Sequence, residues 1–260
     1  MNFYVAAKSD IGKVKKVNQD SYCIKSAATA IGNLVMAVVC DGMGGLEQGE
    51  VASASVVMAF QTWFETCLPQ LIEHFQIEQV KRQWSSLVEQ ENKKILKYGE
   101  QQNIKLGTTL TAILLVDEYM LLSCHVGDSR LYRIGQGVEV LTADHTWVAR
   151  EIKQQRMTEE EAQNHPNRNM LLQCIGVLEH VEPDYSVHRI YPEEVYMLCT
   201  DGFRHNVTKE ELQCLLAPGN LAGEKQIQQR LGELIEMNKS RGEKDNITAV
   251  VVKTVQSEGR

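Results

Sequence analysis

Long hydrophobic runs are missing from this 260-residue chain: no segment approaches about 18 consecutive apolar residues, the length that a membrane-spanning helix needs. Residues 1–5 do not form a basic stretch followed by an apolar run and a small-residue cleavage site, so no signal peptide is evident. We therefore expect a soluble, cytoplasmic protein that has no membrane partner.

Paired cysteines are also missing. The seven cysteines form an odd set without a Cys-X-X-Cys pair, and most lie within apolar runs. We expect reduced thiols in the core: Cys23, Cys40, Cys67, Cys124, Cys174, Cys199 and Cys214.

Positive charge is in the minority. The formal net charge of -7 argues against a nucleic acid as the main partner, because a polyanion would be repelled. A local basic cluster, formed by Lys13, Lys15 and Lys16, is still able to hold one phosphate group.

The strand-like segments of the chain are rich in Val, Ile, Leu and Tyr, and turn signals separate neighbouring ones, which predicts mostly antiparallel sheets. These segments are residues 3–7, 21–25, 34–40, 109–116, 120–126, 130–134, 138–141, 185–190, 195–199 and 247–254. Helical patterns cover residues 48–67, 78–101, 209–216 and 225–238. Strands and helices in two blocks each predict an α+β fold, a four-layer αββα sandwich, as one domain over residues 1–260.

One long polar insertion, residues 142–183, departs from this alternation. It contains a polar helical piece at residues 150–162. Because long insertions are usually functional or mobile, we expect a surface flap that shapes the choice of protein substrate.

Acidic residues recur at the edges of the apolar, β-prone runs. Asp41, Asp201 and Asp245 each lie at such an edge beside Gly or Asn, and Asp20 and Asp128 repeat the pattern. A single Asp-Gly is a turn signal in any protein. Jointly, the carboxylates can converge on hard cations, which prefer oxygen ligands and neutralise acids that otherwise repel one another. The glycines after Asp41 let the backbone turn, so the carbonyl of Gly42 is a further candidate ligand.

An ordered series of short motifs runs through the chain: Asn18-Gln19-Asp20, Asp41-Gly42-Met43-Gly44-Gly45, Gly49-Glu50-Val51-Ala52-Ser53, Gly107-Thr108-Thr109, Val126-Gly127-Asp128-Ser129-Arg130, Asp144-His145, Thr200-Asp201-Gly202 and Asp245-Asn246-Ile247-Thr248. In its order and spacing the series resembles the metal-dependent protein phosphatases (PPM, the type 2C serine/threonine phosphatases). The resemblance covers residues 9–252, and the Met after Asp-Gly is similar to the bacterial branch.

This resemblance implies a centre of two Mn²⁺ or Mg²⁺ ions at one end of the sandwich. Asp41 would bridge the metals, the Gly42 carbonyl would bind one, and Asp201 and Asp245 would bind the other. Asp20 would orient metal-bound waters, while Asn246 and Thr248 support the last ligand. A water activated by the metals would then hydrolyse phosphoserine and phosphothreonine in proteins.

Four positions depart from the family pattern. Lys15 stands where an Arg usually grips the substrate phosphate, and a point charge lacks that two-point grip, so Lys13 or Lys16 can share the work. Gln19 replaces an acid beside the metal-bound waters. His205 stands where many relatives hold a third metal together with the equivalent of Asp128, so that third site is in doubt.

The fourth departure is Met43, which occupies the place of a His proposed as a general acid in eukaryotic members. His145 and His165 are the nearest candidates for that proton transfer, and a surface or capping role is the plainer interpretation of each.

Three functions remain open from the sequence. The first is a phosphatase that opposes a serine/threonine kinase and acts as a monomer. The second is a catalytically weak or silent regulator that binds phosphoproteins, motivated by Lys15, Gln19 and His205. The third is a metal-dependent hydrolase of small phosphate esters.

Overall fold

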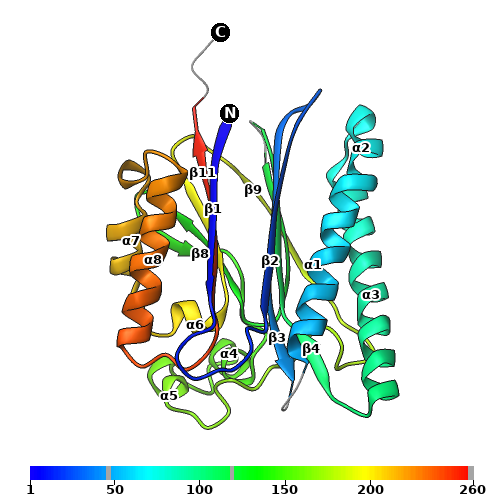
Figure 1. Cartoon of the computed structure of the whole chain (residues 1–260), viewed down its shortest axis with the longest axis vertical. Helices are drawn as coiled ribbons and strands as arrows, with labels where there is room; N and C mark the ends of the chain where they lie inside the picture. The colour runs from blue at the N-terminus through cyan, green and yellow to red at the C-terminus, as the bar shows by residue number, and fades with distance from the viewer. Residues whose placement is uncertain (45–47, 118–119, 257–260) are drawn as a thin grey trace.

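Two antiparallel sheets lie face to face between two layers of helices in the computed structural model, which describes residues 1–44, 48–117 and 120–256 (Figure 1). The first sheet has the order β1 (Asn2–Asp10), β11 (Ile247–Val255), β10 (Val195–Cys199), β7 (Arg130–Ile134) and β8 (Val138–Val140). The second has the order β2 (Asp20–Thr29), β3 (Gly32–Gly44), β5 (Leu110–Val116), β6 (Met120–Val126) and β9 (Asp184–Arg189), with β4 (Leu106–Thr108) paired to β3. The predicted four-layer αββα sandwich is confirmed.

The helices form the outer layers. The second sheet is covered by α1 (Gly49–Thr66), α2 (Leu68–Leu71) and α3 (Ile77–Gln102), with the short 3-10 turn η1 (Ile72–His74) between the last two. The first sheet is covered by α6 (Asp201–Arg204), α7 (Lys209–Leu216), the 3-10 turn η2 (Pro218–Asn220) and α8 (Glu224–Ser240). In the described part of the chain, no helix is long and apolar enough to cross a bilayer.

The β3 strand shows why the sheets are buried on both faces. Val35 and Val39 point into the core between the sheets, whereas Leu34, Met36 and Val38 point toward α1 and α3. A strand covered on both faces needs apolar residues at every position, which explains the unbroken apolar run before Asp41.

Helices α1 and α3, both predicted from the sequence pattern, pack against one another on that sheet. Trp84 of α3 lies edge-on to Phe60 and Trp63 of α1, with ring centroids 5.2 Å and 5.5 Å away. Such aromatic pairs add stability beyond the area that they bury. The helical layer is therefore held firmly beside the strands that carry the acids.

Three expectations need correction. The chain does not turn at Gly42, since β3 continues through Asp41 to Gly44. The predicted flap helix at residues 150–162 is two short helices, α4 (Trp147–Lys153) and α5 (Glu159–Gln163), because Gln155 has φ of 57° and Thr158 caps a new helix. The thiol of Cys214 is exposed and Cys67 is half-buried, whereas the other five cysteines are buried; all seven are free.

Candidate metal centre

Four acidic residues lie at the same end of the sandwich, which is the lower end in Figure 1, where β3 ends and α6 begins. Asp20 begins β2 and Asp41 lies near the end of β3, where the two residues are direct cross-strand partners. Asp201 begins α6 directly after β10, and Asp245 lies two residues before β11. Each sheet therefore contributes two carboxylates to this end of the sandwich.

Asp41 is held by its backbone. Its N–H donates to the hydroxyl of Thr109 at 2.9 Å, and its carbonyl accepts from the N–H of Thr109 and the hydroxyl of Thr108, each at 2.9 Å. Burial raises the pKa of the Asp41 carboxyl well above its usual range, and the charges of Asp20 and Asp201 raise it further. The fold thus maintains a carboxylate in a place that penalises its negative charge.

Asp20 is buried on the same face. Its Oδ2 accepts a hydrogen bond from the hydroxyl of Thr200 at 3.0 Å, while its buried Oδ1 has no partner among the described residues. Burial raises the pKa of Asp20 to about 7, although the hydroxyls of Thr248 and Thr200 oppose the shift. An orphaned carboxylate oxygen costs free energy unless a cation or water occupies the space beside it.

The first sheet supplies Asp201 and Asp245. Asp201 Oδ1 is also buried and unpartnered among the described residues. Asp245 Oδ1 accepts the N–H of Asn246 at 2.8 Å and forms an ion pair with Lys15 Nζ at 2.8 Å. Lys15 is therefore placed beside a candidate ligand, at the edge of the acidic cluster.

The donor set fits hard divalent cations. It consists of carboxylate oxygens, two of them buried without a partner, in a place where burial, and then the neighbouring negative charges, raise the pKa values of Asp20 and Asp41. Across residues 1–44, 48–117 and 120–256, no group of three or more His, Cys, Asp or Glu side chains is placed to hold a metal ion as it stands. The negative charge and the carboxylate oxygens that a cation needs are present, and one of these oxygens, Asp245 Oδ1, is paired with Lys15.

Gly42 lies where three backbone segments cross. Its N–H donates to the carbonyl of Gln19 at 3.1 Å, and a Cβ added to it would lie 2.2 Å from the carbonyl oxygen of Gly49. Only glycine fits this crossing, which fixes the end of β3 against the start of α1. Gly45, the last residue of the Asp41 motif, lies outside the described residues.

Asn246 joins the two sheets beside Asp245. Its Oδ1 accepts the N–H of Gln19 at 2.9 Å, and its amide donates to the carbonyls of Ile11 at 2.9 Å and Val17 at 3.1 Å. The side chain of Gln19 donates to Glu50 at 3.3 Å. Asn246 thus holds the loop between β1 and β2 against the Asp245 segment, and Gln19 takes part in this contact through its backbone.

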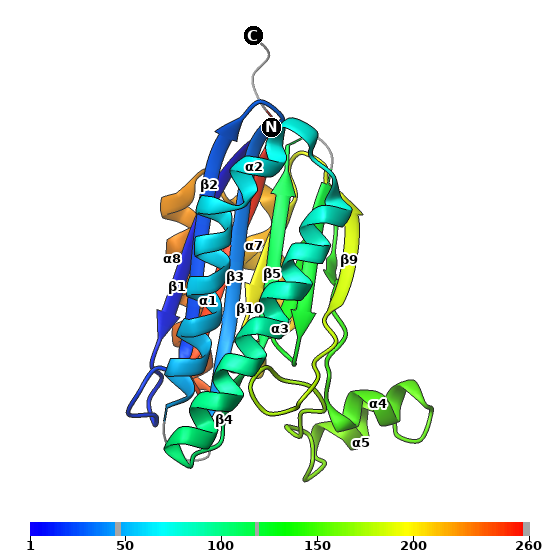
Figure 2. The same cartoon turned by 90° about the vertical axis from the view of Figure 1, so that its right-hand side faces the viewer.

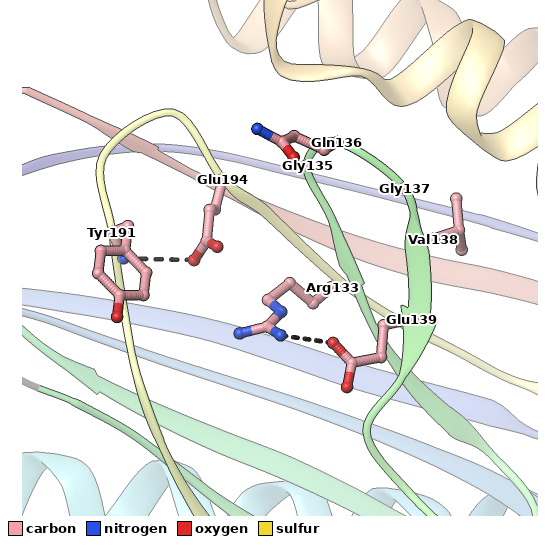
Figure 3. A pocket seen from close by; sticks show the side chains of 8 residues that line it. All are labelled: Arg133, Gly135, Gln136, Gly137, Val138, Glu139, Tyr191 and Glu194. Atoms are coloured by element: carbon pink, nitrogen blue, oxygen red, sulfur yellow. Dashed lines mark hydrogen bonds and ion pairs between the residues drawn. The ribbon is translucent and has the colours of Figure 1, made fainter.

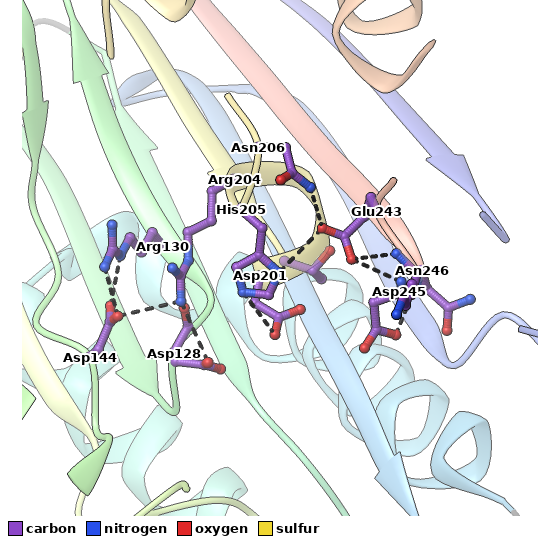
Figure 4. A network of polar contacts seen from close by, with 12 residues as sticks. Asp128, Arg130, Asp144, Asp201, Arg204, His205, Asn206, Glu243, Asp245 and Asn246 are labelled. Atoms are coloured by element: carbon purple, nitrogen blue, oxygen red, sulfur yellow. Dashed lines mark hydrogen bonds and ion pairs between the residues drawn. The ribbon is translucent and has the colours of Figure 1, made fainter. Parts of the chain in front are cut away.

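An ion network surrounds Asp128 (Figure 4). Arg204 donates to the carbonyl of Asp128 at 3.1 Å and lies 3.5 Å from its Oδ2 and 3.4 Å from Asp144 Oδ2. Arg130 grips Asp144 with two hydrogen bonds of 2.8 Å. Burial raises the pKa of Asp128 to about 7, with Asp201 adding to the shift and Arg204 opposing it.

His205 lies between two acids (Figure 4). Its Nε2 is 3.5 Å from Asp201 Oδ2, and its Nδ1 is 3.3 Å from Glu243 Oε2. The other oxygen of Glu243 accepts the N–H groups of Lys244 at 2.8 Å and Asp245 at 2.9 Å. Glu243 therefore connects the Asp201 helix to the Asp245 loop.

Sequence reasoning missed Glu243 and Arg204 as parts of the site. The only signal available for them was a charged residue close to a motif acid, which is common on protein surfaces. Their partners lie 38 and 76 residues away in the chain, His205 and Asp128 respectively, and no short-range pattern indicates such pairs.

The two candidate general acids make structural contacts. His145 Nε2 lies 3.0 Å from Asp184 Oδ2, and its Nδ1 accepts the N–H of Gly127 at 3.3 Å. His165 stacks on Trp147 with ring centroids 4.7 Å apart. These contacts favour a structural role for His145 and His165 over a role in proton transfer.

A separate pocket of about 430 Å³ lies at the other end of the first sheet (Figure 3). Its lining includes Arg133, Glu139, Tyr191 and Glu194, and an ion pair joins the first two. Because Arg133 pairs with Tyr196 whereas Arg130 pairs with Cys199, next to the acids, this pocket lies away from the candidate centre.

The comparisons with known proteins agree with this fold. A family model described as protein phosphatase 2C matches residues 12–246. The serine/threonine phosphatase stp of Listeria monocytogenes serovar 1/2a is 30% identical, over 94% of this chain and 93% of that protein. The solved serine/threonine phosphatase of S. agalactiae superposes with a TM-score of 0.84 at 29% identity, covering 98% of this chain and 100% of that one.

A further solved structure, the catalytic domain of the phosphatase PstP in complex with two manganese ions, has a TM-score of 0.75 at 29% identity, covering 98% of this chain and 99% of that one. The antiparallel sandwich with acids at one end is thus the architecture of a metal-dependent phosphatase, and the chain belongs to the protein phosphatase 2C family. It is a protein serine/threonine phosphatase of the bacterial type.

Proposed function

We propose that Asp41, the Gly42 carbonyl, Asp201 and Asp245 hold two divalent cations, Mn²⁺ or Mg²⁺, with which this enzyme dephosphorylates phosphoserine and phosphothreonine. The observation that carries the proposal is the meeting of four carboxylates, two from each sheet, with the Oδ1 atoms of Asp20 and Asp201 buried and unpartnered among the described residues. When bound, such a cation pair supplies a more acidic water and neutralises charge on the phosphoryl oxygens.

The side chains of the protein contribute to the reaction by orienting water and by placing charge beside the substrate phosphate. The Oδ1 of Asp20 is buried without a partner among the described residues, so it is available to accept a hydrogen bond from water and orient it. Thr200 and Thr248 hold this carboxylate: the Thr200 hydroxyl donates to its Oδ2, and the Thr248 N–H donates to the Thr200 hydroxyl at 3.1 Å.

Lys15 would bind the substrate phosphate. Its ammonium lies 2.8 Å from Asp245 Oδ1, so a phosphoryl group beside that carboxylate is within its reach. An ammonium neutralises one oxygen as a compact point charge and lacks the two-point grip of a guanidinium. We therefore expect a higher KM for phosphopeptide in this chain than in a Lys15→Arg variant.

Two cations rather than three fit this chain. The carboxylate of Asp128 is engaged by Arg204, and His205 is engaged by Asp201 and Glu243. Imidazole is also a poorer ligand than carboxylate for Mg²⁺. Proton transfer to the leaving hydroxyl is assigned to water, because His145 and His165 both make structural contacts.

The partners that we propose are phosphorylated proteins, including a cognate serine/threonine kinase or its targets. We propose a monomer that acts in the cytoplasm. The alternative of a silent phosphoprotein-binding regulator is not favoured, because Asp41, Asp201 and Asp245 all reach the same end of the sandwich.

The test combines calorimetry and turnover. Asp41→Asn and Asp201→Asn should abolish both the heat of Mn²⁺ binding and the hydrolysis of a phosphothreonine peptide, with the circular dichroism spectrum unchanged. Glu73→Gln, at an exposed position in η1 at the other end of the molecule, is the matched control and should behave as wild type. Undiminished turnover in either Asp variant would refute the assignment.

A further inference from the structure

One charged segment beside the centre has a part in the reaction as described only through Lys15, and its other two lysines are not used. It is the loop of residues 11–17, hereafter the basic rim loop, which joins β1 to β2 at the acidic end of the sandwich (Figures 1 and 2). It contains Lys13, Lys15 and Lys16, and no acidic residue lies between Asp10 and Asp20. In a chain with a formal net charge of -7, this is a local reversal of sign.

The basic rim loop is fixed in place at both ends. The side-chain amide of Asn246 donates to the carbonyls of Ile11 and Val17, the two ends of the loop. Gly12 has φ of +78°, its N–H donates to Asp10 Oδ1 at 2.8 Å, and a Cβ added there would lie 2.4 Å from the Asp245 carbonyl oxygen. The loop is therefore built directly onto the segment that carries a candidate metal ligand.

The middle of the loop is open to solvent and its charge is only partly neutralised. Lys15 is paired with Asp245, and the acid at the base of the loop, Asp10, is paired with Lys239 at 3.2 Å. Lys13 and Lys16 are exposed, and within the described ranges neither forms an ion pair. Two free ammonium groups thus flank the one that faces the site.

Exposed apolar side chains alternate with these charges. Val14 is 61% exposed and Val17 is 48% exposed. Covering Val14 would add the free energy of burying its apolar surface, which the chain alone does not gain. A bound peptide would cover Val14 with its backbone while its side chains meet the lysines.

We infer that the basic rim loop recognises acidic side chains next to the phosphorylated residue of a protein substrate, through Lys13 and Lys16. This inference rests on the proposed function, because it takes the acids at the end of the sandwich as the place where the phosphate is bound. It assigns a substrate class, acidic phosphopeptide segments, to a surface that adjoins that place.

The preference follows from charge complementarity at a surface. An exposed ion pair contributes about 0.2–1 kcal/mol, so two of them favour an acidic peptide by roughly 2- to 30-fold in kcat/KM, and salt weakens the preference. Electrostatic complementarity of this kind selects partners and raises association rates more than it changes the chemical step. We therefore expect the preference to appear as a lower KM for the acidic peptide, with kcat unchanged.

The experiment compares two phosphothreonine peptides of equal length, one with glutamates and one with glutamines beside the phosphothreonine, with Mn²⁺ present at low and high salt. The readout is the ratio of the two kcat/KM values, in which any contact with the phosphate group itself cancels. Lys13→Glu, Lys16→Glu and the double variant are measured beside Lys225→Glu. Lys225 is an exposed lysine near the start of α8, at the opposite end of the molecule, and its variant makes the same change of net charge as each single variant.

The wild type and Lys225→Glu should prefer the glutamate peptide, more strongly at low salt, and the double variant should lose or invert that preference through KM. No preference in the wild type, or a preference that the double variant retains, would overturn the inference. So would a loss of binding to phosphatidylserine vesicles in the double variant with an unchanged peptide ratio, because the loop would then serve a membrane. If the wild type fails to hydrolyse para-nitrophenyl phosphate with Mn²⁺, the proposed function fails instead.

Discussion

Asp20 and Asp41 are direct partners across the β2–β3 ladder, so two carboxylates lie on the same face of the same sheet. Like charges in directly opposite positions destabilise a sheet, and burial makes the repulsion larger than it is at a surface. The pKa values of both carboxyls are raised for these reasons. A protein that retains such a pair accepts a cost in stability at its site.

The first prediction removes one of these charges. Asp20→Asn should increase the free energy of unfolding by about 1 kcal/mol at pH 8 in the presence of a chelator, because the cross-strand repulsion is lost. The same variant should bind Mn²⁺ more weakly. Urea denaturation and calorimetry measure the two effects. A variant that is less stable than wild type without metal would contradict the argument.

The second prediction concerns the link through Glu243. Glu243→Ala leaves the N–H groups of Lys244 and Asp245 without their carboxylate partner, so it should lower the free energy of unfolding by about 1–3 kcal/mol and the affinity for Mn²⁺ by roughly 10-fold. Glu243→Gln should recover part of the affinity because one amide oxygen still accepts. Lys244→Ala, exposed in the same loop, is the control. Wild-type affinity in Glu243→Ala would rule out this positioning role.

The third prediction separates stability from activity. Lys253 is buried in β11, where its ammonium donates to the carbonyls of Pro218 and Leu221, each at 2.9 Å, and pairs with Glu193 at 2.8 Å. Lys253→Met should lower the free energy of unfolding by about 1–3 kcal/mol with kcat unchanged. Glu193→Gln should cost less than about 1 kcal/mol, since that carboxylate is half exposed. Chemical denaturation measures the free energy of unfolding of both variants. Equal decreases in the two would show that the hydrogen bonds of Lys253 to the carbonyls of Pro218 and Leu221 do not account for its contribution.

The fourth prediction is a pH dependence that His125 introduces. Its Nε2 lies 3.1 Å from the Ala143 carbonyl and carries the proton, while its Nδ1 lies 3.0 Å from the Thr111 hydroxyl, so the neutral ring is satisfied. Burial and the neighbouring His145 lower the pKa of His125 to about 4, and the opposing charges of Asp144 and Asp184 only partly offset this shift.

The direction of the effect follows from the depressed pKa. Between about pH 6.5 and pH 4 the unfolded chain binds a proton at this position that the folded protein does not, so the free energy of unfolding falls as the pH falls. The full loss is about 3 kcal/mol below pH 4. Denaturation curves of wild type and His125→Gln should converge over this window as the pH falls. Parallel curves would show that His125 does not titrate there.

The sequence predicts most of the fold because its signals are strong and local. Strands such as β6 and β10 begin and end at the residues expected, since unbroken apolar runs bounded by turns leave little choice of register. The long helix α3 was predicted to within one residue at each end, because its apolar positions repeat over many turns. The acids at strand ends likewise predicted a metal site at one end of the sandwich, and the choice of ligands stays a prediction.

Short elements and long-range pairs are what the sequence does not reveal. Strand β4 has three residues and α6 has four, too few for any period to be visible. The continuation of β3 past Gly42 depends on its crossing with Gly49, which lies on another element. The ion pair between Lys15 and Asp245, 230 residues apart, likewise exists only once β1 has paired with β11.

The division of the acids between the two sheets has a mechanical consequence. Asp20 and Asp41 move with one sheet, whereas Asp201 and Asp245 move with the other, so any ion that they share cross-links the two halves of the sandwich at this edge. Ion binding and the separation of the two sheets at this edge are then thermodynamically coupled. Binding an ion stabilises the closely packed edge, and separation of the sheets there releases the ion.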